Sequence, residues 1–482
     1  MDEFNIIIPC CGKGQRFIDA GYEVYKPGLK FFDKPMLLHI IDSFPEKYKK
    51  WIITDSEHFS VLKKILKNHK NISFCIIDSH KNGPAWSILK AVDEIPQNQK
   101  CFVVYNDVFW KWDFSNVYSF IHSENPDGIV FTQTGYHPHL YKNSFSAFCK
   151  VENGKLIEIK EKGCFTDNWM LEPLSIGVYY FSNSSVMLEN IRTLIENEEK
   201  IAGEYYPSVI YNKLIGSGLK VLIYEIKSFI HLGTPEQYED AHVWNQIMNS
   251  ENPENNIPIL EMMCGTGSRM KDISEMNKAG LPIHSKPMFR FVADNYKSDR
   301  VVFLVNNDTQ SFLNIKDSYI NIGKQTSTQS ESLLKALPQM LECKNVLITS
   351  NDCYGFFDLS LLDGFRNYDM VLFGFKLRLI HTKQGNAHSG FSFIGNNVTE
   401  ISIKLVKKGQ LGLAGLYYFP DIKLLKNLNA FDFENNGSVD HIASYLLKLN
   451  AKIGVVELKN YVHLGTLEEY YEFGFWKNFY NE

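Results

Sequence analysis

A chain of 482 residues exceeds the roughly 250 to 300 residues at which one hydrophobic core stops growing, so two domains are the first expectation. Apolar residues make up 44% of the chain, yet no stretch approaches the roughly 20 apolar residues of a membrane-inserted helix. A net charge of −5 without a long Lys/Arg run argues against nucleic-acid binding, and nine cysteines without paired spacing fit a reduced, cytoplasmic protein.

Short apolar runs and amphipathic segments alternate through the first half of the chain. Buried strands are expected at residues 5–9, 51–55, 73–78 and 101–107. Helical spacing of apolar residues is present at residues 58–69 and 84–95. This alternation predicts an α/β fold with a mixed, mostly parallel sheet, in which ligands bind beyond the carboxyl ends of the strands.

The first expected strand leads into CGKGQRF, a loop with two glycines, a lysine and an arginine. Gly12 and Gly14 allow a tight bend whose backbone N–H groups face phosphate oxygens, and Lys13 and Arg16 neutralise the phosphate charge. The loop has neither the Walker A spacing nor the third glycine of a dinucleotide fingerprint. On this segment alone, the alternative interpretation, an ordinary glycine turn with solvated basic side chains, remains open.

Two further positions suit phosphate chemistry. Lys26 offers a compact positive charge for a phosphoryl oxygen that becomes more negative during reaction. Asp107 follows Asn106 at the carboxyl end of an expected strand, where a carboxylate can hold Mg²⁺ against phosphate oxygens. A solvated lysine and an aspartate that caps a helix are the alternatives.

The same pattern recurs in the second half of the chain. CGKGQRF at 11–17 reappears as CGTGSRM at 264–270, and IHLGTPEQYED at 230–240 reappears as VHLGTLEEYYE at 462–472. The positions that the second copy keeps are Gly265, Gly267, Arg269, Lys278, Asp352, Lys404 and Gly415.

This duplication predicts two tandem domains, residues 1–248 and 257–482. Residues 249–256, polar and with a proline at position 253, read as an exposed linker. By analogy with symmetric homodimers, the duplication could place the two domains as a pseudo-dimer inside one chain.

In combination, these motifs resemble the sugar-1-phosphate nucleotidyltransferase family, whose fold is GT-A-like and Rossmann-like. The resemblance rests on the glycine loop, Lys26-Pro27, Gly83 before a helix, Asn106-Asp107, Glu161-Lys162, Gly177 and the LGTPE segment. It covers nearly all of residues 1–245 and, more loosely, residues 257–475.

The resemblance implies a role for each matched residue. Gly12, Gly14 and Arg16 would hold the nucleotide phosphates together with Lys13 and Asn106; Lys26 would hold the α-phosphate and Gly83 would line the base pocket. Asp107 would bind Mg²⁺, Glu161 a substrate hydroxyl and Lys162 the acceptor phosphate, and Gly177 would leave room for the acceptor. Arg16, Lys26 and Lys162 are the expected catalytic residues. The partners would be a nucleoside triphosphate and a phosphorylated small molecule.

The implied reaction is attack of the acceptor phosphate on the α-phosphorus with release of pyrophosphate. Positioning and charge neutralisation carry such a reaction, because the attacking phosphate is already ionised. The product would feed capsule or surface glycan synthesis. A glycosyltransferase that uses a nucleotide sugar and a nucleotide-binding regulator without turnover are the alternatives.

The chain departs from the family pattern in two places. Many members carry a second metal-binding aspartate just before the late LGT turn, where this chain has His231 and, in the second copy, His463. In the second copy Ala279, Thr328 and Ile403 replace Pro27, Gly83 and Glu161. This predicts a changed or lost acceptor site there, so a different substrate and a degenerate regulatory domain both remain open.

Overall fold

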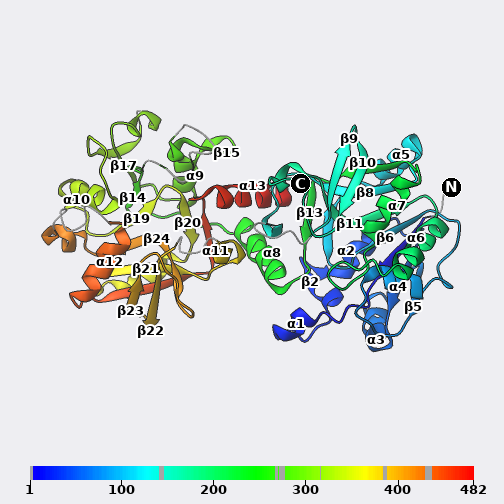
Figure 1. The fold of residues 1–482 in the computed structure, drawn as a ribbon. Helices are drawn as coiled ribbons and strands as arrows, with labels where there is room; N and C mark the ends of the chain where they lie inside the picture. Colours follow the sequence, from blue (N-terminus) through cyan, green and yellow to red (C-terminus); the bar gives the residue numbers. More distant parts are fainter. Residues whose placement is uncertain are drawn as a thin grey trace. The chain divides into compact units, whose positions relative to one another are not determined.

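The computed structural model describes residues 4–140, 146–265, 267, 270, 277–314, 316–383, 388–428 and 437–481. The chain forms two compact units: unit 1 is Met1–His242 with Asn481–Glu482, and unit 2 is Val243–Tyr480 (Figure 1). The division falls within helix α8 (Pro235–Met248). None of the described helices is long and apolar enough to cross a membrane.

Unit 1 is built on a nine-stranded sheet in the order β5-β4-β1-β6-β11-β8-β12-β10-β9. The strands are, in that order, Ile72–Ile76, Lys49–Thr54, Asn5–Pro9, Cys101–Val104, Leu174–Phe181, Gly128–Gln133, Val221–Glu225, Lys155–Lys160 and Phe148–Glu152. The first four strands are parallel, and β11 runs antiparallel to both of its neighbours. The sheet is therefore mixed, and its parallel half matches the strands expected from the sequence.

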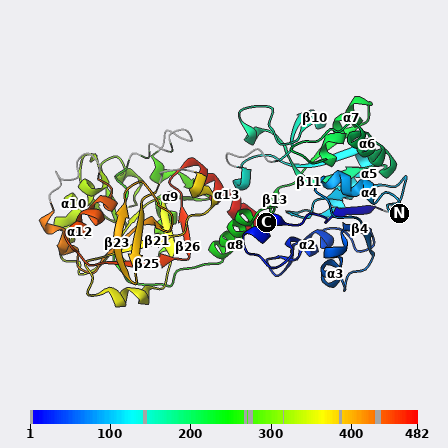
Figure 2. The ribbon, with the colours of Figure 1, turned by 60° about the horizontal axis from the view of Figure 1, so that its bottom comes forward.

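Helices cover both faces of this sheet because successive side chains of its central strand point to opposite sides. Ile6 and Ile8 of β1 are fully buried among α2 (Met36–Asp42), α3 (Ser56–Ile65) and α5 (Phe114–Glu124). Ile7 is buried on the other face, among α4 (Pro84–Lys90), α6 (Ser184–Glu196) and α7 (Ile210–Gly216). The result is a three-layer α/β/α unit (Figure 2).

A two-stranded ribbon beside the main sheet ties the middle of unit 1 to its end. β7 (Val108–Lys111) pairs antiparallel with β13 (Ser228–His231), and Val108 is the register partner of His231. The backbone N–H of Leu232 donates to the carbonyl of Asp107 at 2.8 Å. This pairing brings two segments more than a hundred residues apart to the carboxyl end of β6.

Unit 2 repeats the topology, with a nine-stranded sheet in the order β18-β17-β14-β19-β24-β21-β25-β23-β22. Its strands are Ser318–Asn321, Val301–Val305, Ile259–Met262, Val346–Ser350, Leu411–Phe419, Met370–Phe375, Ile453–Leu458, Asn397–Ser402 and Gly390–Ile394. The ribbon of β20 (Cys353–Phe356) and β26 (Asn460–His463) pairs Cys353 with His463, as Val108 pairs with His231 in unit 1. The helices are α9 (Met288–Asn295), α10 (Gln329–Met340), α11 (Leu379–Lys383), α12 (Val439–Lys448) and α13 (Leu467–Asn481).

Residues 249–256, expected as an exposed linker, fall within unit 2 and are only partly exposed. Asn252 is buried, and its side-chain amide donates to the carbonyls of Asn295 and Gly355 at 2.9 and 3.0 Å. Asn252 is the exception in a segment whose other residues are exposed or half-buried, because a polar side chain that donates hydrogen bonds to backbone carbonyls can be buried. The nine cysteines are free thiols.

Candidate active site

The glycine loop follows β1 and packs against Lys26. Gly14 has φ 66°, a left-handed conformation that favours glycine, and a Cβ there would lie 3.4 Å from the Cβ of Lys26. The loop then enters the short helix α1 (Gln15–Asp19), while the side chains of Lys13 and Arg16 remain exposed. The left-handed conformation favours glycine at this position, and the basic side chains are accessible to an anion.

Lys26 and Asp107 form an ion pair at the carboxyl ends of the strands. Lys26 Nζ lies 3.0 Å from Asp107 Oδ2, with 14% and 30% of the two side chains exposed. Burial is the largest single influence and raises the pKa of Asp107, but charge interactions and hydrogen bonds, those with Lys26 foremost, together hold that pKa below its usual value. Beside them, Asn106 Nδ2 donates to the carbonyl of Pro9 at 2.7 Å and joins β6 to the end of β1.

His231 is a neutral neighbour of this pair. Burial lowers the pKa of His231 to about 4, so the imidazole carries no charge at neutral pH. Its Nε2 lies 3.1 Å from the Ser146 hydroxyl. A Cβ at Gly233, two residues on, would lie 3.1 Å from Asp107 Oδ2, so the late LGT turn packs directly on the Asp107 carboxylate.

A second carboxylate lies at the end of β10. The Ser208 hydroxyl donates to Glu161 Oε2 at 2.5 Å, and burial raises the pKa of Glu161 to about 7. Lys162 has φ 57°, a strained conformation for a lysine, and its Nζ lies 4.8 Å from the centre of the Tyr206 ring. Glu161 and Lys162 are thus neighbours in a turn in which Lys162 has a left-handed backbone conformation.

Two glycines allow close packing around these charges. Gly177 of β11 has φ 78°, and a Cβ there would meet the Tyr105 ring at 2.9 Å. Gly83, which precedes α4, has φ 88°, and a Cβ there would meet the carbonyl oxygen of Tyr205 at 2.8 Å. Neither position admits a side chain without movement of its neighbours.

The predicted positions of the first copy therefore gather at one edge of the sheet, around the ends of β1, β6 and β10. Sequence reasoning missed the residues that contact His231, Lys162 and Glu161, which are Ser146, Tyr206 and Ser208. The short segment EYYPS at 204–208 has neither the periodicity of a strand nor a known motif, and only its contact with Gly83 and Glu161 gives it importance.

Unit 2 keeps the same backbone frame at its equivalent positions. Lys278 pairs with Asp352, and a Cβ at Gly267 (φ 65°) would meet the Cβ of Lys278. Lys404 and Gly415 keep positive φ values of 51° and 72°. Gly265 follows β14, as Gly12 follows β1, whereas Arg269 lies outside the described residues.

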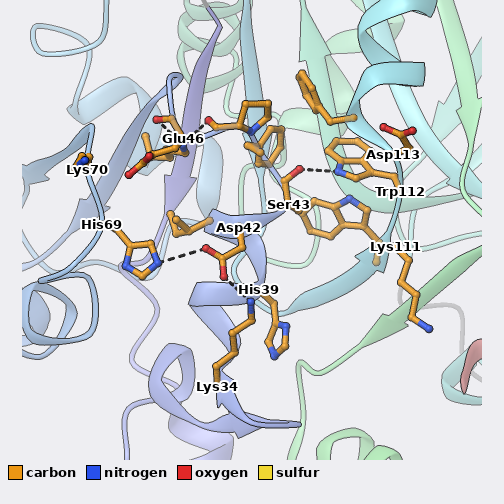
Figure 3. A pocket seen from close by; sticks show the side chains of 16 residues that line it. Lys34, His39, Asp42, Ser43, Glu46, His69, Lys70, Lys111, Trp112 and Asp113 are labelled. Atoms are coloured by element: carbon orange, nitrogen blue, oxygen red, sulfur yellow. Dashed lines mark hydrogen bonds and ion pairs between the residues drawn. The ribbon is translucent and has the colours of Figure 1, made fainter.

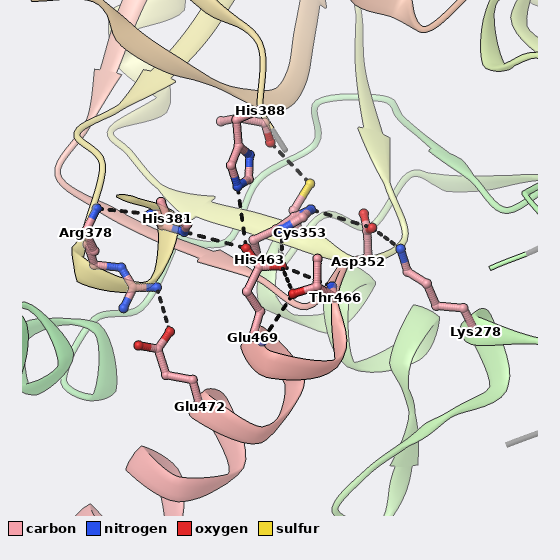
Figure 4. A network of polar contacts seen from close by, with 11 residues as sticks. Lys278, Asp352, Cys353, Arg378, His381, His388, His463, Thr466, Glu469 and Glu472 are labelled. Carbon is pink, nitrogen blue, oxygen red and sulfur yellow. Dashed lines mark hydrogen bonds and ion pairs between the residues drawn. The ribbon is translucent and has the colours of Figure 1, made fainter. Parts of the chain in front are cut away.

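Behind Asp352, unit 2 has a buried histidine network centred on Glu469 (Figure 4). Glu469 Oε2 lies 2.6 Å from His463 Nδ1, and His463 Nε2 lies 3.7 Å from Asp352 Oδ2. Glu469 Oε1 faces Nε2 of His388 and His381 at 3.5 and 3.7 Å.

The atoms of His381, His388 and Glu469 are close enough to share a cation, within 4.8 Å of one another. However, His381 Nδ1 accepts the backbone N–H of Arg378 at 3.0 Å. A neutral imidazole whose Nδ1 accepts carries its proton on Nε2, and a protonated nitrogen has no lone pair for a metal ion. The network therefore fixes His463 beside Asp352 through hydrogen bonds and charge.

A hollow of about 850 Å³ lies elsewhere on unit 1, between the end of α2 and the start of α5 (Figure 3). Its lining includes the Lys34–Asp42 ion pair, His69, Lys111 and Trp112, and none of the residues predicted as functional. An equivalent hollow of about 500 Å³ in unit 2 has the Lys286–Asp294 pair at the same place. The volume of a hollow therefore does not indicate where the predicted functional residues lie in this protein.

Comparison with known proteins finds a family match for unit 1. The family model described as nucleotidyl transferase matches residues 5–242. No curated protein sequence matches the chain.

Solved structures that are similar to this chain include a nucleoside-diphosphate-sugar pyrophosphorylase from Vibrio cholerae (23% identity, 49% of this chain and 98% of that chain, TM-score 0.42). An inositol-1-phosphate CTP transferase from T. maritima is 12% identical over 49% of this chain and 92% of its own, with a TM-score of 0.38. A UDP-glucose pyrophosphorylase complexed with UDP-glucose is 16% identical over 51% and 99%, with a TM-score of 0.41.

The matched residues contain the glycine loop, the Lys26–Asp107 pair, the Glu161–Lys162 turn and His231. The unit that holds all of these side chains belongs to the nucleotidyl transferase family.

Proposed function

We propose that unit 1 couples a nucleoside triphosphate to a phosphorylated sugar, or to a similar phosphate monoester, and releases pyrophosphate. The observation that carries the proposal is the Lys26–Asp107 pair, held between the glycine loop and the ribbon at the carboxyl ends of the strands. In this family such a product is an activated precursor, and we propose that it serves capsule or surface glycan synthesis.

The donor half of the site would act on the triphosphate. The exposed backbone of Gly12 and the side chains of Lys13 and Arg16 would bind its phosphates, as oriented N–H groups and basic side chains do. Lys26 would leave Asp107 and move its positive charge to the α-phosphate, where negative charge develops in the transition state. Gly83 and the adjoining Tyr205 backbone would border the base.

The chemistry of the donor set fits a divalent cation. Mg²⁺ prefers oxygen and is commonly held by one or two carboxylates together with substrate oxygens and water. Asp107, kept ionised by Lys26, offers the carboxylate, whereas the neutral His231 nitrogen is a poor ligand for this ion. Bound there, Mg²⁺ would neutralise the charge of the triphosphate.

The acceptor half of the site would orient the attacking phosphate. Glu161, when ionised, would accept a hydrogen bond from a hydroxyl group of the phosphorylated substrate. Lys162 would bind the phosphate of that substrate and direct its oxygen toward the α-phosphorus. The Tyr206 ring holds Lys162 Nζ from one side, so the ammonium is already partly ordered before the acceptor arrives. No protein nucleophile is needed, because holding the two ionised substrates close together in the right orientation accounts for the rate acceleration.

The test is pyrophosphate release from each of the four nucleoside triphosphates with Mg²⁺ and a panel of sugar 1-phosphates and polyol phosphates. Asp107→Asn should reduce the rate at least a hundredfold, whereas Asp352→Asn, the matched change in unit 2, should leave unit 1 active. Absence of pyrophosphate release from the wild type with every pair would contradict the proposal, and hydrolysis of a nucleotide sugar instead would favour a glycosyltransferase.

A further inference from the structure

Unit 2 has a carboxylate where unit 1 has one, but a different element supplies it. In unit 1 the carboxylate belongs to Glu161 after β10, and its hydrogen-bond partner, Ser208, precedes α7. In unit 2 the position of Glu161 is Ile403, and the position of Ser208 is Asp440, in the first turn of α12.

The structure fixes this equivalence at both positions. Lys162 and Lys404, which follow Glu161 and Ile403, share positive φ values of 57° and 51°. On the other side, Ala85 N donates to Tyr205 O in unit 1 and Ser330 N donates to Gly437 O in unit 2. Ser208 and Asp440 each lie three residues after that carbonyl. The acid of unit 2 therefore stands at the position of the Ser208 hydroxyl, and an isoleucine stands at the position of Glu161.

Asp440 is held in a way that keeps a carboxylate beside the same tyrosine. Its Oδ1 accepts a hydrogen bond from the Tyr417 hydroxyl, and its Oδ2 accepts one from the Ser389 hydroxyl at 2.6 Å. Tyr417 follows Gly415 by two residues, as Tyr179 follows Gly177, and in unit 1 Glu161 is near enough to Tyr179 to raise its pKa further. Like Glu161, Asp440 is only partly buried, so lone pairs of its oxygens can reach a ligand.

Next to the position of the nucleotide base, unit 2 has lost side chains that unit 1 has. Trp86 stacks on Tyr205 in unit 1 with ring centres 6.1 Å apart, whereas the equivalent residues of unit 2 are Glu331 and Gly437. Thr328 takes the place of Gly83, and its hydroxyl caps α10 by accepting Glu331 N. Unit 2 thus lacks the aromatic pair next to the base position while its acceptor position retains an acid and a lysine.

We propose that unit 2 is a second ligand site, which binds a phosphorylated sugar or polyol through Asp440 and Lys404 without a nucleotide base. Asp440 accepts hydrogen bonds from hydroxyl groups of the ligand, and Lys404 neutralises its phosphate. This inference rests on the proposed function of unit 1, because the expected role of Glu161 supplies the comparison.

The test measures binding of glucose 1-phosphate and of inositol 1-phosphate to the full chain by calorimetry, with Mg²⁺ and no nucleotide. For at least one of these probes, Asp440→Asn should weaken binding tenfold or more, since a hydrogen bond to a charged group is lost. Asp421→Asn, which also removes an acid at a helix start in unit 2, should leave binding within about twofold.

A double variant separates recognition from folding. Ile403→Glu with Asp440→Ser restores the unit 1 arrangement, and it should recover the binding that Asp440→Asn loses. Wild-type binding that Asp440→Asn does not change, or the absence of binding of both probes, would overturn the inference. Pyrophosphate release is measured in parallel. Loss of ligand binding by unit 2 with normal pyrophosphate release would overturn this inference alone, whereas absence of pyrophosphate release would contradict the proposed function of unit 1.

Discussion

Lys26 Nζ and Asp107 Oδ2 lie 3.0 Å apart although 81 positions separate them in the sequence. Each group neutralises the other, so under the proposed function the binding of triphosphate and cation would exchange this pair for contacts with phosphate and metal. That exchange makes both side chains sensitive to substitution in a predictable direction.

Lys26→Met should lower kcat by about a hundredfold to a thousandfold with a smaller effect on KM, because a charge that acts mainly in the transition state is lost. The measurement is steady-state pyrophosphate release. Lys34→Met is the matched control, because Lys34 also pairs with an aspartate of unit 1, Asp42, but lies at the hollow of Figure 3. A Lys26→Met enzyme as active as the control would remove Lys26 from the reaction.

The raised pKa of Glu161, about 7, predicts a pH dependence of acceptor binding. The carboxyl is protonated below this pKa and ionised above it, so the KM for the acceptor should fall as pH rises from about 6 to 8. Glu161→Gln should abolish this component, while the titration of the acceptor phosphate itself remains in both proteins. Exposed Glu158 on the same strand provides the control, Glu158→Gln. An unchanged pH profile in Glu161→Gln would contradict the assignment.

The same shift has a stability consequence of definite sign. Folded Glu161 binds its proton more tightly than the unfolded chain does, so its contribution to stability is complete below about pH 4.5 and is lost as pH rises through about 7. Hydrogen exchange of the β10 turn should therefore become faster across this window in the wild type than in Glu161→Gln.

His231→Asp should lower the Mg²⁺ concentration that gives half-maximal activity severalfold, because it adds a carboxylate oxygen beside Asp107 in place of a neutral imidazole. His231→Asn is the control, since it removes the ring without adding charge. If both variants have the same Mg²⁺ requirement, residue 231 does not face the cation.

Gly83→Ala should destabilise unit 1 by about 2 to 3 kcal/mol and raise the KM for the nucleotide, because the new methyl group meets backbone atoms of Tyr205 at 2.8 to 2.9 Å. Gly21→Ala is matched for conformation, with φ 86° against 88°, but its Cβ would have nothing within 4 Å. The control should cost only about 1 kcal/mol. Equal losses, measured by thermal unfolding, would mean that conformation alone explains the glycine.

Much of the fold was predictable because its signals are local. Residues 5–9 and 101–107 were expected as buried strands, and the structure has strands at Asn5–Pro9 and Cys101–Val104. Polar residues at the carboxyl ends of such strands fall at one sheet edge in an α/β arrangement. The antiparallel direction of β11 was not predictable, because a strand buried on both faces is a continuous apolar run in either direction.

The surroundings of Glu161 show the other limit of sequence reasoning. Ser208 matters only because its hydroxyl reaches Glu161 from 47 positions away, and no local pattern marks it. Asp440 is harder still, since alignment of the two copies shows only that Glu161 has become Ile403. A carboxylate restored from another element becomes visible only when the hydrogen bonds are known.

The pairing of Val108 with His231 also bears on how the protein is made. The ribosome adds His231 to the chain 124 residues after Asp107, a delay of roughly 6 to 25 s at about 5 to 20 residues per second. Until then β7 has no partner, and the Asp107 backbone carbonyl lacks the hydrogen bond from Leu232. A nascent chain released before this point would therefore carry the glycine loop and Lys26 without the ribbon, so the candidate site is completed late in the synthesis of unit 1.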